Sequence, residues 1–227
     1  VFPKLLENKN PETPLRIWIA GCSTGEEAYS IAICFKEFLG ERKDTLQIFA
    51  TDLSEPAIAK ARSGVYSTSQ LQSVSAQRLG EFFIKKNDGF HIKKSIRDMC
   101  VFAVHNFLKD PPFGRMDFIS CRNVLIYMEP YLQKKAMITF HYALNPNGIL
   151  LLGKTETTSG ATDLFSSFGK SDKLFLRKDA SVKFMHVASL RLAMVYGRGG
   201  RGNLERMARG IRAGWFPPLP ETGNRRS

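Results

Sequence analysis

The chain has 227 residues, of which 43% are apolar, and this is enough to bury the core of one sizeable domain. It contains no run of about 18 apolar residues and no signal-peptide pattern, which argues against a membrane-spanning helix and against secretion. The formal net charge of +12 is uneven, because residues 181–227 carry nine Lys and Arg against two Asp and Glu, so the body of the chain is only mildly basic.

The first half of the chain alternates between predicted strands and helices. Residues 1–14 are polar and contain three prolines, and we expect them to form a short helix and a lead-in from a preceding domain. The next elements are a strand at 15–20, a helix at 26–39, a strand at 46–51 and a helix at 54–62. This order is typical of a parallel sheet covered by helices on both faces.

The interval between Gly64 and Asp98 interrupts the alternation. Residues 75–83 have a helical pattern, and residues 83–94 form two half-apolar segments around Asp88-Gly89, a strong tight-turn signal. We therefore predict a small antiparallel β-subdomain, at about 65–98, inserted into the sheet domain. Such a subdomain can offer a strand edge to an extended peptide.

The alternation resumes after the insertion. Strands are predicted at 101–104, 116–121, 149–152 and 173–177, and an amphipathic helix at 130–144. We place one α/β domain at 15–180. The Gly- and Arg-rich residues 181–227 show no period, and we predict a basic, disordered tail.

The cysteine pattern argues against a zinc site. Cys22, Cys34, Cys100 and Cys121 include no C-x-x-C pair and no His at ligand spacing. We expect free thiols, no metal and a reducing cytoplasmic location. The chain begins without Met, and we interpret it as a fragment of a longer protein.

The turn Gly21-Cys-Ser-Thr-Gly25, followed by Glu26 and Glu27, predicts the kind of ligand. A helix N-terminus after a strand usually attracts anions, but two carboxylates at that point repel a pyrophosphate. They favour a cationic, ribose-bearing ligand such as S-adenosylmethionine. The G-x-G-x-x-G spacing of nicotinamide sites is absent.

Glu27 and Asp52 are more informative together than separately. Glu27 alone fits a capping box begun by Thr24, and Asp52 alone is a polar residue that ends a strand. However, a carboxylate at the end of the second strand is where a ribose is held in dinucleotide-type folds. The pair therefore favours a ligand site over two local roles.

Further candidate binding residues follow the strands at 101–104 and 116–121. Asn106 and Phe107 follow the first, while Arg122, Asn123 and Tyr127 follow the second. Ligands of open parallel sheets bind outside the carboxyl ends of the strands, and these residues are placed there. The alternative for Tyr127 is packing beneath the next helix.

Several segments together resemble the CheR-type chemotaxis-receptor protein-glutamate O-methyltransferases. The resemblance runs in order from about Phe2 to Lys178. The segments that carry it are Arg16–Ser30, Ala50-Thr-Asp52, Asn106-Phe-Leu108, Cys121-Arg-Asn-Val-Leu-Ile-Tyr127 and Gly153-Lys-Thr-Glu156.

This resemblance implies a class I S-adenosylmethionine-dependent methyltransferase fold, Rossmann-like, with a mostly parallel seven-stranded sheet. It implies methyl transfer to glutamates of receptor cytoplasmic domains, with S-adenosylhomocysteine as product, and a receptor peptide docked on the inserted subdomain. Tyr127 matches the family tyrosine near the transferred methyl. The expected cofactor contacts are Ala20, Gly21, Cys22, Glu27, Asp52, Leu53, Asn106, Phe107, Arg122 and Asn123. We expect a monomer without a nucleic-acid partner.

Two other functions remain open. The family's N-terminal helical domain and its T-x-F-F-R segment precede the start of this chain, a family arginine has no clear counterpart at 7–14, and G-H-S-E reads Gly153-Lys-Thr-Glu156. The chain could thus bind S-adenosylmethionine as a sensory module without turnover. Asp110-Pro-Pro-Phe113 resembles the base-holding motif of nucleic-acid N-methyltransferases, but it precedes the strand that it should follow.

Overall fold

The computed structural model describes residues 1–179 except 8, 11, 41–44, 159 and 170–172. The tail at 181–227, predicted to be disordered, lies outside the described residues. Within the described ranges, no helix is both long enough and apolar enough to cross a membrane.

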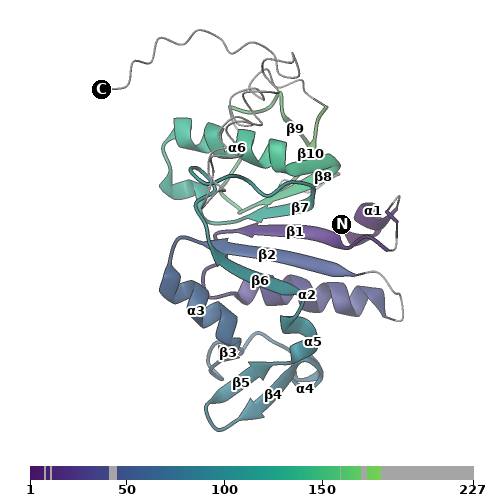
Figure 1. Cartoon of the computed structure of the whole chain (residues 1–227), viewed down its shortest axis with the longest axis vertical. Helices are drawn as coiled ribbons and strands as arrows, with labels where there is room; N and C mark the ends of the chain where they lie inside the picture. The colour runs from purple at the N-terminus through teal and green to yellow at the C-terminus, as the bar shows by residue number, and fades with distance from the viewer. Residues whose placement is uncertain (8, 11, 41–44, 159, 170–172, 180–227) are drawn as a thin grey trace, which may run out of the picture. The chain divides into compact units, whose positions relative to one another are not determined.

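The central element is a seven-stranded sheet with the order β6-β2-β1-β7-β8-β10-β9 (Figure 1). The first five strands of this order, β6-β2-β1-β7-β8, pair in parallel. Strand β10 pairs antiparallel with β8, and β9 pairs antiparallel with β10. The predicted α/β fold with a mostly parallel seven-stranded sheet is therefore confirmed. The strands are β1 (Leu15–Ala20), β2 (Leu46–Asp52), β6 (Cys100–Val104), β7 (Met116–Cys121), β8 (Leu144–Leu152), β9 (Phe165–Ser167) and β10 (Leu174–Arg177).

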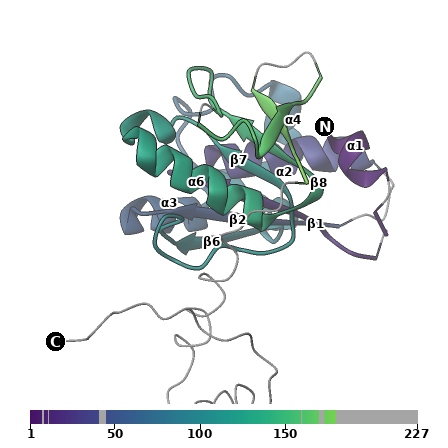
Figure 2. The same cartoon turned by 90° about the horizontal axis from the view of Figure 1, so that it is seen from above.

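Both faces of the sheet are covered, which explains why β1 is almost continuously apolar. Ile17 and Ile19 belong to the same core cluster as the apolar residues of α2 (Glu26–Leu39) and α3 (Glu55–Ser63). Helix α6 lies on the opposite face of the sheet (Figure 2). Trp18 points to that face, where its ring packs edge-on against Phe140 of α6 at 5.6 Å between centroids. Helix α6 spans Pro130–Ala143, and the short α1 spans Phe2–Leu6.

A second, three-stranded antiparallel sheet lies between α3 and β6 in the sequence. Its order is β3-β5-β4, and the predicted β4–β5 hairpin is present, but its two turn residues are Asn87-Asp88, one position earlier than predicted, because Gly89 already pairs with Lys86 as the first residue of β5. Gly89 has φ +136°, and a Cβ there would lie 2.7 Å from the Tyr66 carbonyl oxygen of β3, so the start of β5 requires glycine. The elements are β3 (Val65–Tyr66), α4 (Ala76–Phe82), β4 (Phe83–Lys86), β5 (Gly89–Ile92) and α5 (Lys94–Arg97).

Strand β8 begins five residues earlier than the predicted strand at 149–152. The Asn145-Pro-Asn-Gly148 segment has the composition of a turn, but in the structure it is part of the strand. An irregular register between Met116 and Phe118 of β7 accommodates it. The Asn145 side-chain amide donates to Asp117 Oδ1 at 2.8 Å and anchors the start of the strand.

The buried His141 of α6 makes folding stability dependent on pH. Burial lowers its pKa below the ordinary value, against the raising effect of the Lys178 carbonyl, which lies 2.8 Å from Nε2. The unfolded chain therefore binds a proton at a pH where the folded chain does not. We expect the free energy of unfolding to fall as the pH drops below about 6.5.

Urea unfolding at pH 7.5 and pH 5.5 measures this effect. The His141→Gln variant keeps a donor for the Lys178 carbonyl but has no titrating ring. Its midpoint should change less between the two pH values than the wild-type midpoint does. Equal pH dependence in both proteins would contradict the assignment.

Candidate functional site

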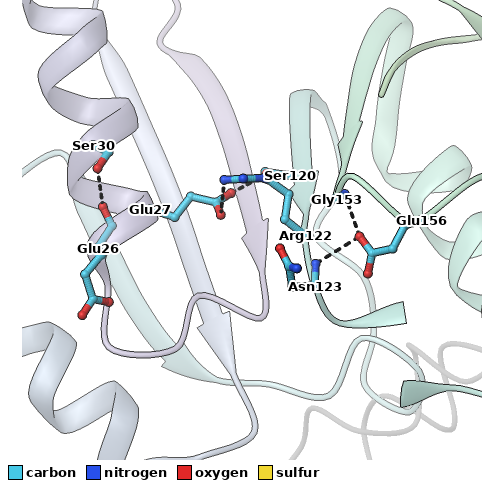
Figure 3. Close-up of polar contacts among 8 residues, drawn as sticks. All are labelled: Glu26, Glu27, Ser30, Ser120, Arg122, Asn123, Gly153 and Glu156. Carbon is cyan, nitrogen blue, oxygen red and sulfur yellow. Dashed lines mark hydrogen bonds and ion pairs between the residues drawn. The ribbon is translucent and has the colours of Figure 1, made fainter. Parts of the chain in front are cut away.

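The candidate site lies at the carboxyl ends of the parallel strands. The chain runs from β1 to β2 and β6 on one side, then returns to β7 on the other side of β1. The reversal between β1 and β7 is the switch point at which open α/β sheets bind ligands. In Figure 3, Glu27 from α2 and Arg122 from the segment after β7 point toward each other across this place.

The turn between β1 and α2 is held tightly against β2. The backbone N–H groups of Gly21 and Cys22 donate to the Thr51 carbonyl at 2.8 and 2.9 Å. Gly21 has φ +81°, and a Cβ there would lie 2.4 Å from Val124 Cγ2. The glycine therefore lets the turn approach the segment that follows β7.

Glu27 does not form a capping box. Helix α2 has Gly25 as its N-cap without a side-chain capping bond, and Thr24 bonds to Glu26 instead. The Glu27 carboxylate accepts a hydrogen bond from the Ser120 hydroxyl and pairs with Arg122 Nη1 at 3.2 Å. The capping alternative is therefore wrong, and the carboxylate is directed toward the predicted site residue Arg122.

Asp52 occupies the predicted place at the end of β2. Its two carboxylate oxygens accept the backbone N–H groups of Ser23 and Ser54, each at 2.9 Å. These bonds fix the carboxylate beside the turn and leave further lone pairs for a hydroxyl-bearing ligand. The following Leu53 is 66% exposed, so its side chain is available to a ligand.

The buried residues among the predicted cofactor contacts can offer a ligand only their backbone groups. Ala20 and Cys22 are 1% and 3% exposed. Burial, reinforced by the Asp52 charge, raises the pKa of Cys22 to about 12, so its side chain stays a neutral thiol. The turn thus presents carboxylates and peptide groups rather than a reactive sulfur.

Asn106 and Phe107 are engaged by their own segment. The Asn106 backbone N–H donates to Asp110 at 2.7 Å, and its side-chain oxygen accepts the Leu108 N–H at 3.0 Å. The Phe107 ring is buried and packs on Phe140 at 5.3 Å between centroids. Because the Asn106 N–H is already bound to Asp110, the predicted ligand contacts of Asn106 and Phe107 must use other groups of these two residues.

Glu156 is a residue of the site that the predicted set lacks. Glu156 is 4% exposed, and its carboxylate accepts four backbone N–H groups, those of Asn123, Val124, Leu125 and Gly153, at 2.7–3.0 Å. Figure 3 shows the bonds from Asn123 and Gly153. It thereby determines the path of the segment after β7. The Gly153-Lys-Thr-Glu156 motif was the available signal, but three of the four partners of Glu156 lie 31 to 33 residues away along the chain.

The same segment is held from its carbonyl side as well. The Gln133 amide on α6 donates to the carbonyls of Leu125 and Met128 at 3.1 and 2.9 Å. Tyr127 lies between these anchors and is 84% exposed, so it does not pack beneath the helix. A rigid segment therefore presents an exposed aromatic side chain close in sequence to Arg122 and Asn123.

The Asp110-Pro-Pro-Phe113 segment has a packing role. The Phe113 ring lies 5.2 Å from the Trp18 ring and 5.1 Å from the Phe49 ring, between centroids. It helps cover the sheet face that α6 covers, and it is not free to stack on a flipped base. This packing speaks against the nucleic-acid alternative.

A cavity of about 440 Å³ opens beside Glu27 and Arg122. Its lining contains both polar and apolar residues. The polar residues are Glu26, Glu27, Ser30 and Arg122, and the others are Phe2, Ile31, Cys34 and Leu151. Among the described residues, no cluster of His, Cys, Asp and Glu could hold a metal ion.

Comparison with known proteins identifies the family. Residues 1–174 match the family described as CheR methyltransferase, SAM binding domain. The chain belongs to the CheR methyltransferase family. The resemblance drawn from its motifs is confirmed, and S-adenosylmethionine is the cofactor that the family's binding domain takes. The individual contact residues remain predictions.

Individual relatives agree with this assignment. The chain is 36% identical over 170 residues to the chemotaxis protein methyltransferase Cher2 of Pseudomonas putida, and 34% identical over 178 residues to that of Salmonella typhimurium. It is 42% identical over 154 residues, 67% of its length, to an uncharacterized 104.1 kDa protein of Rhodobacter capsulatus. The alignments cover 72% and 75% of this chain for the two methyltransferases. The matched region makes up 62% of the length of each of the two methyltransferases and 16% of the length of the Rhodobacter protein.

Proposed function

We propose that this chain transfers the methyl group of S-adenosylmethionine to glutamate side chains of chemotaxis receptors. The observation that carries the proposal is the acidic edge of the sheet, where Glu27 and Asp52 flank a tight turn in a CheR-family domain. Relatives named chemotaxis protein methyltransferases support the substrate class. Receptor cytoplasmic domains as substrates would place the protein in the cytoplasm.

The chemistry needs alignment more than acid–base help. When bound, S-adenosylmethionine supplies a methyl on a positively charged sulfur. The acceptor carboxylate takes over this methyl, and S-adenosylhomocysteine remains. A glutamate of ordinary pKa is ionised at pH 7, so no general base is required. Arg122 offsets the charge of Glu27 and so reduces repulsion of the incoming carboxylate.

We assign the cofactor contacts by the groups that each residue exposes. Asp52 would accept the ribose hydroxyls, and Leu53 would contact the base. Ala20, Gly21 and Cys22 would contribute through the backbone of the turn. Glu27 would hold the ammonium of the methionine part, with Arg122, Asn123, Asn106 and Phe107 completing the site.

Tyr127 is proposed to act at the transferred methyl. Its exposed ring can face a sulfonium, an attraction of about 0.5–2 kcal/mol. We expect Tyr127→Ala to lower the rate of methyl transfer roughly tenfold, with a smaller effect on S-adenosylhomocysteine affinity. Tyr127→Phe keeps the ring and removes the hydroxyl, so it distinguishes the contribution of the ring from that of the hydroxyl.

Methyl transfer from labelled S-adenosylmethionine to receptor cytoplasmic domains measures the Tyr127 effect. Tyr142→Ala is the control, because Tyr142 is also partly exposed but lies near the end of α6. Unchanged transfer in both Tyr127 variants would show that the assigned role is wrong.

The inserted sheet is proposed to dock a receptor peptide. Strand β4 is an outer strand of the order β3-β5-β4, and it carries the half-exposed Ile84 next to Lys85 and Lys86. An added strand could pair with its outer edge, and the lysines would favour an acidic peptide. Slower amide exchange at β4 on adding receptor domains would support this docking.

A titration with S-adenosylhomocysteine followed by the transfer assay tests the proposed function. Binding together with labelling of receptor glutamates is the expected result. Binding without labelling would favour the second candidate, a sensory module without turnover. That candidate is favoured by the Rhodobacter relative, in which the matching region is 16% of a much larger protein. Tight, salt-sensitive binding of DNA or RNA would instead favour a nucleic-acid methyltransferase.

A further inference from the structure

Tyr66 connects the inserted sheet to the turn between β1 and α2. It belongs to β3, is 2% exposed, and its hydroxyl donates to the Thr24 carbonyl at 2.9 Å. Thr24 lies in the turn that carries the candidate cofactor contacts. A side chain of the inserted sheet therefore touches the backbone of the candidate site.

This contact supports a part of the turn that β2 does not reach. The N–H groups of Gly21 and Cys22 are bound to Thr51, and the N–H of Ser23 is bound to Asp52. These bonds all hold the first half of the turn. The hydroxyl of Tyr66 holds the second half from outside.

Gly25 shows how closely the second half is packed. Its φ is +94°, and a Cβ there would lie 2.9 Å from Ala61 Cβ and 3.2 Å from the Tyr66 hydroxyl oxygen. The turn can approach α3 and Tyr66 only with glycine at this position. The end of the turn and the start of α2 are therefore seated against the tyrosine.

The surroundings keep Tyr66 in place as a donor. Burial raises its pKa well above the ordinary value, and the negative charge of Glu26 adds to this, so the hydroxyl stays protonated. Its backbone pairs with Phe90 of β5, and its ring lies edge-on to Tyr29 at 6.1 Å between centroids. The donor is thus oriented by the inserted sheet.

We propose that Tyr66 is a positioning residue for the cofactor, and that its hydroxyl holds the turn between β1 and α2 in the conformation that binds S-adenosylmethionine. Without this bond the Thr24 carbonyl lacks its donor, and the turn populates other conformations. Affinity then falls in proportion to the binding-competent fraction. The inserted sheet contributes a residue to the cofactor site as well as a surface for peptides.

Tyr66→Phe and Tyr29→Phe form a matched pair for the test. Tyr29 is also 2% exposed, and its hydroxyl donates to the Ala61 carbonyl at 2.8 Å without touching the turn. Both variants lose one buried tyrosine hydrogen bond, so both should unfold at a lower temperature than the wild type. Only Tyr66→Phe should bind S-adenosylhomocysteine more weakly, by about fivefold to tenfold.

Calorimetric titration with S-adenosylhomocysteine gives the decisive values. Wild-type affinity in Tyr66→Phe, or an equal loss in Tyr29→Phe, would overturn the positioning role. The inference rests on cofactor binding and not on receptor methylation, so loss of methyl transfer with normal binding would count only against the proposed function. A wild-type protein that does not bind S-adenosylhomocysteine would overturn the cofactor site and the role of Tyr66 together.

Hydrogen exchange of backbone amides in the wild-type protein tests the proposal even if the Tyr66→Phe variant does not fold. Saturating S-adenosylhomocysteine should slow exchange at residues 65–66 as well as in the turn at 21–25. Protection confined to the turn would overturn the proposal, because the hydroxyl bond would then be indifferent to the ligand.

Discussion

Glu156→Gln is expected to abolish measurable cofactor binding and to lower the free energy of unfolding by about 3 kcal/mol or more. One oxygen of the carboxylate accepts the N–H groups of Val124 and Leu125, and the other accepts those of Asn123 and Gly153. A glutamine keeps one acceptor oxygen and places an amide N–H₂ against the other two donors. Each lost bond to a buried carboxylate costs roughly 1.5–3 kcal/mol.

The functional loss follows from where these N–H groups lie. Three of them, those of Asn123, Val124 and Leu125, belong to the segment that carries Arg122 and Tyr127, so displacement of this segment separates Arg122 from Glu27. Urea unfolding and titration with S-adenosylhomocysteine measure the two effects. Glu129→Gln is the matched control, because Glu129 is an exposed carboxylate at the N-cap of α6 without a capping bond.

A second variant tests the same arrangement without altering the charge. In Gly153→Ala the new Cβ would lie 2.6 Å from Glu156 Oε2 and 2.9 Å from the Asn123 backbone nitrogen. It should therefore disturb the same segment by steric pressure and weaken S-adenosylhomocysteine binding. Normal stability and affinity in both Glu156→Gln and Gly153→Ala would contradict the organising role of Glu156.

The order of the main elements could be read from the sequence because local patterns dominate there. Strands buried on both faces, such as Leu15–Ala20 and Met116–Cys121, are short apolar runs bounded by polar residues, and both were predicted with their observed bounds. The hairpin was predictable from Asp88-Gly89. In contrast, Val65–Tyr66 and Phe165–Ser167 are strands only through pairing with distant partners, and two or three residues carry no usable period.

The residues of the candidate site also fall into those that the sequence could place and those that it could not. Asp52 and Asn123 could be placed at the carboxyl ends of strands, because strand order alone puts them there. The partner of Glu27 could not be derived, since Thr24 offers a local capping interpretation and Ser120 and Arg122 lie 93 and 95 residues away. The roles of Glu156 and Tyr66 likewise depend on hydrogen bonds to backbone groups, which leave no trace in side-chain composition.

Glu27→Gln is expected to weaken S-adenosylhomocysteine binding at least tenfold, whereas Glu26→Gln should change it less than twofold. The two carboxylates are neighbours in the first turn of α2, so any general effect of charge at the helix N-terminus is shared. Their carboxylates point in different directions. Glu27 faces Ser120 and Arg122 beneath the carboxyl ends of the strands, while Glu26 bonds to Thr24 of its own turn.

We expect the two positions to differ because the proposed role of Glu27 is to hold the ammonium group of the ligand, which needs a fixed carboxylate. An amide at position 27 keeps an acceptor for Ser120 but loses the charge that attracts the ammonium and pairs with Arg122. Calorimetric titration of both variants gives the comparison. Equal losses would mean that the acidic helix start acts only through its overall charge, and a loss in Glu26→Gln alone would place the ligand on the other side of the turn.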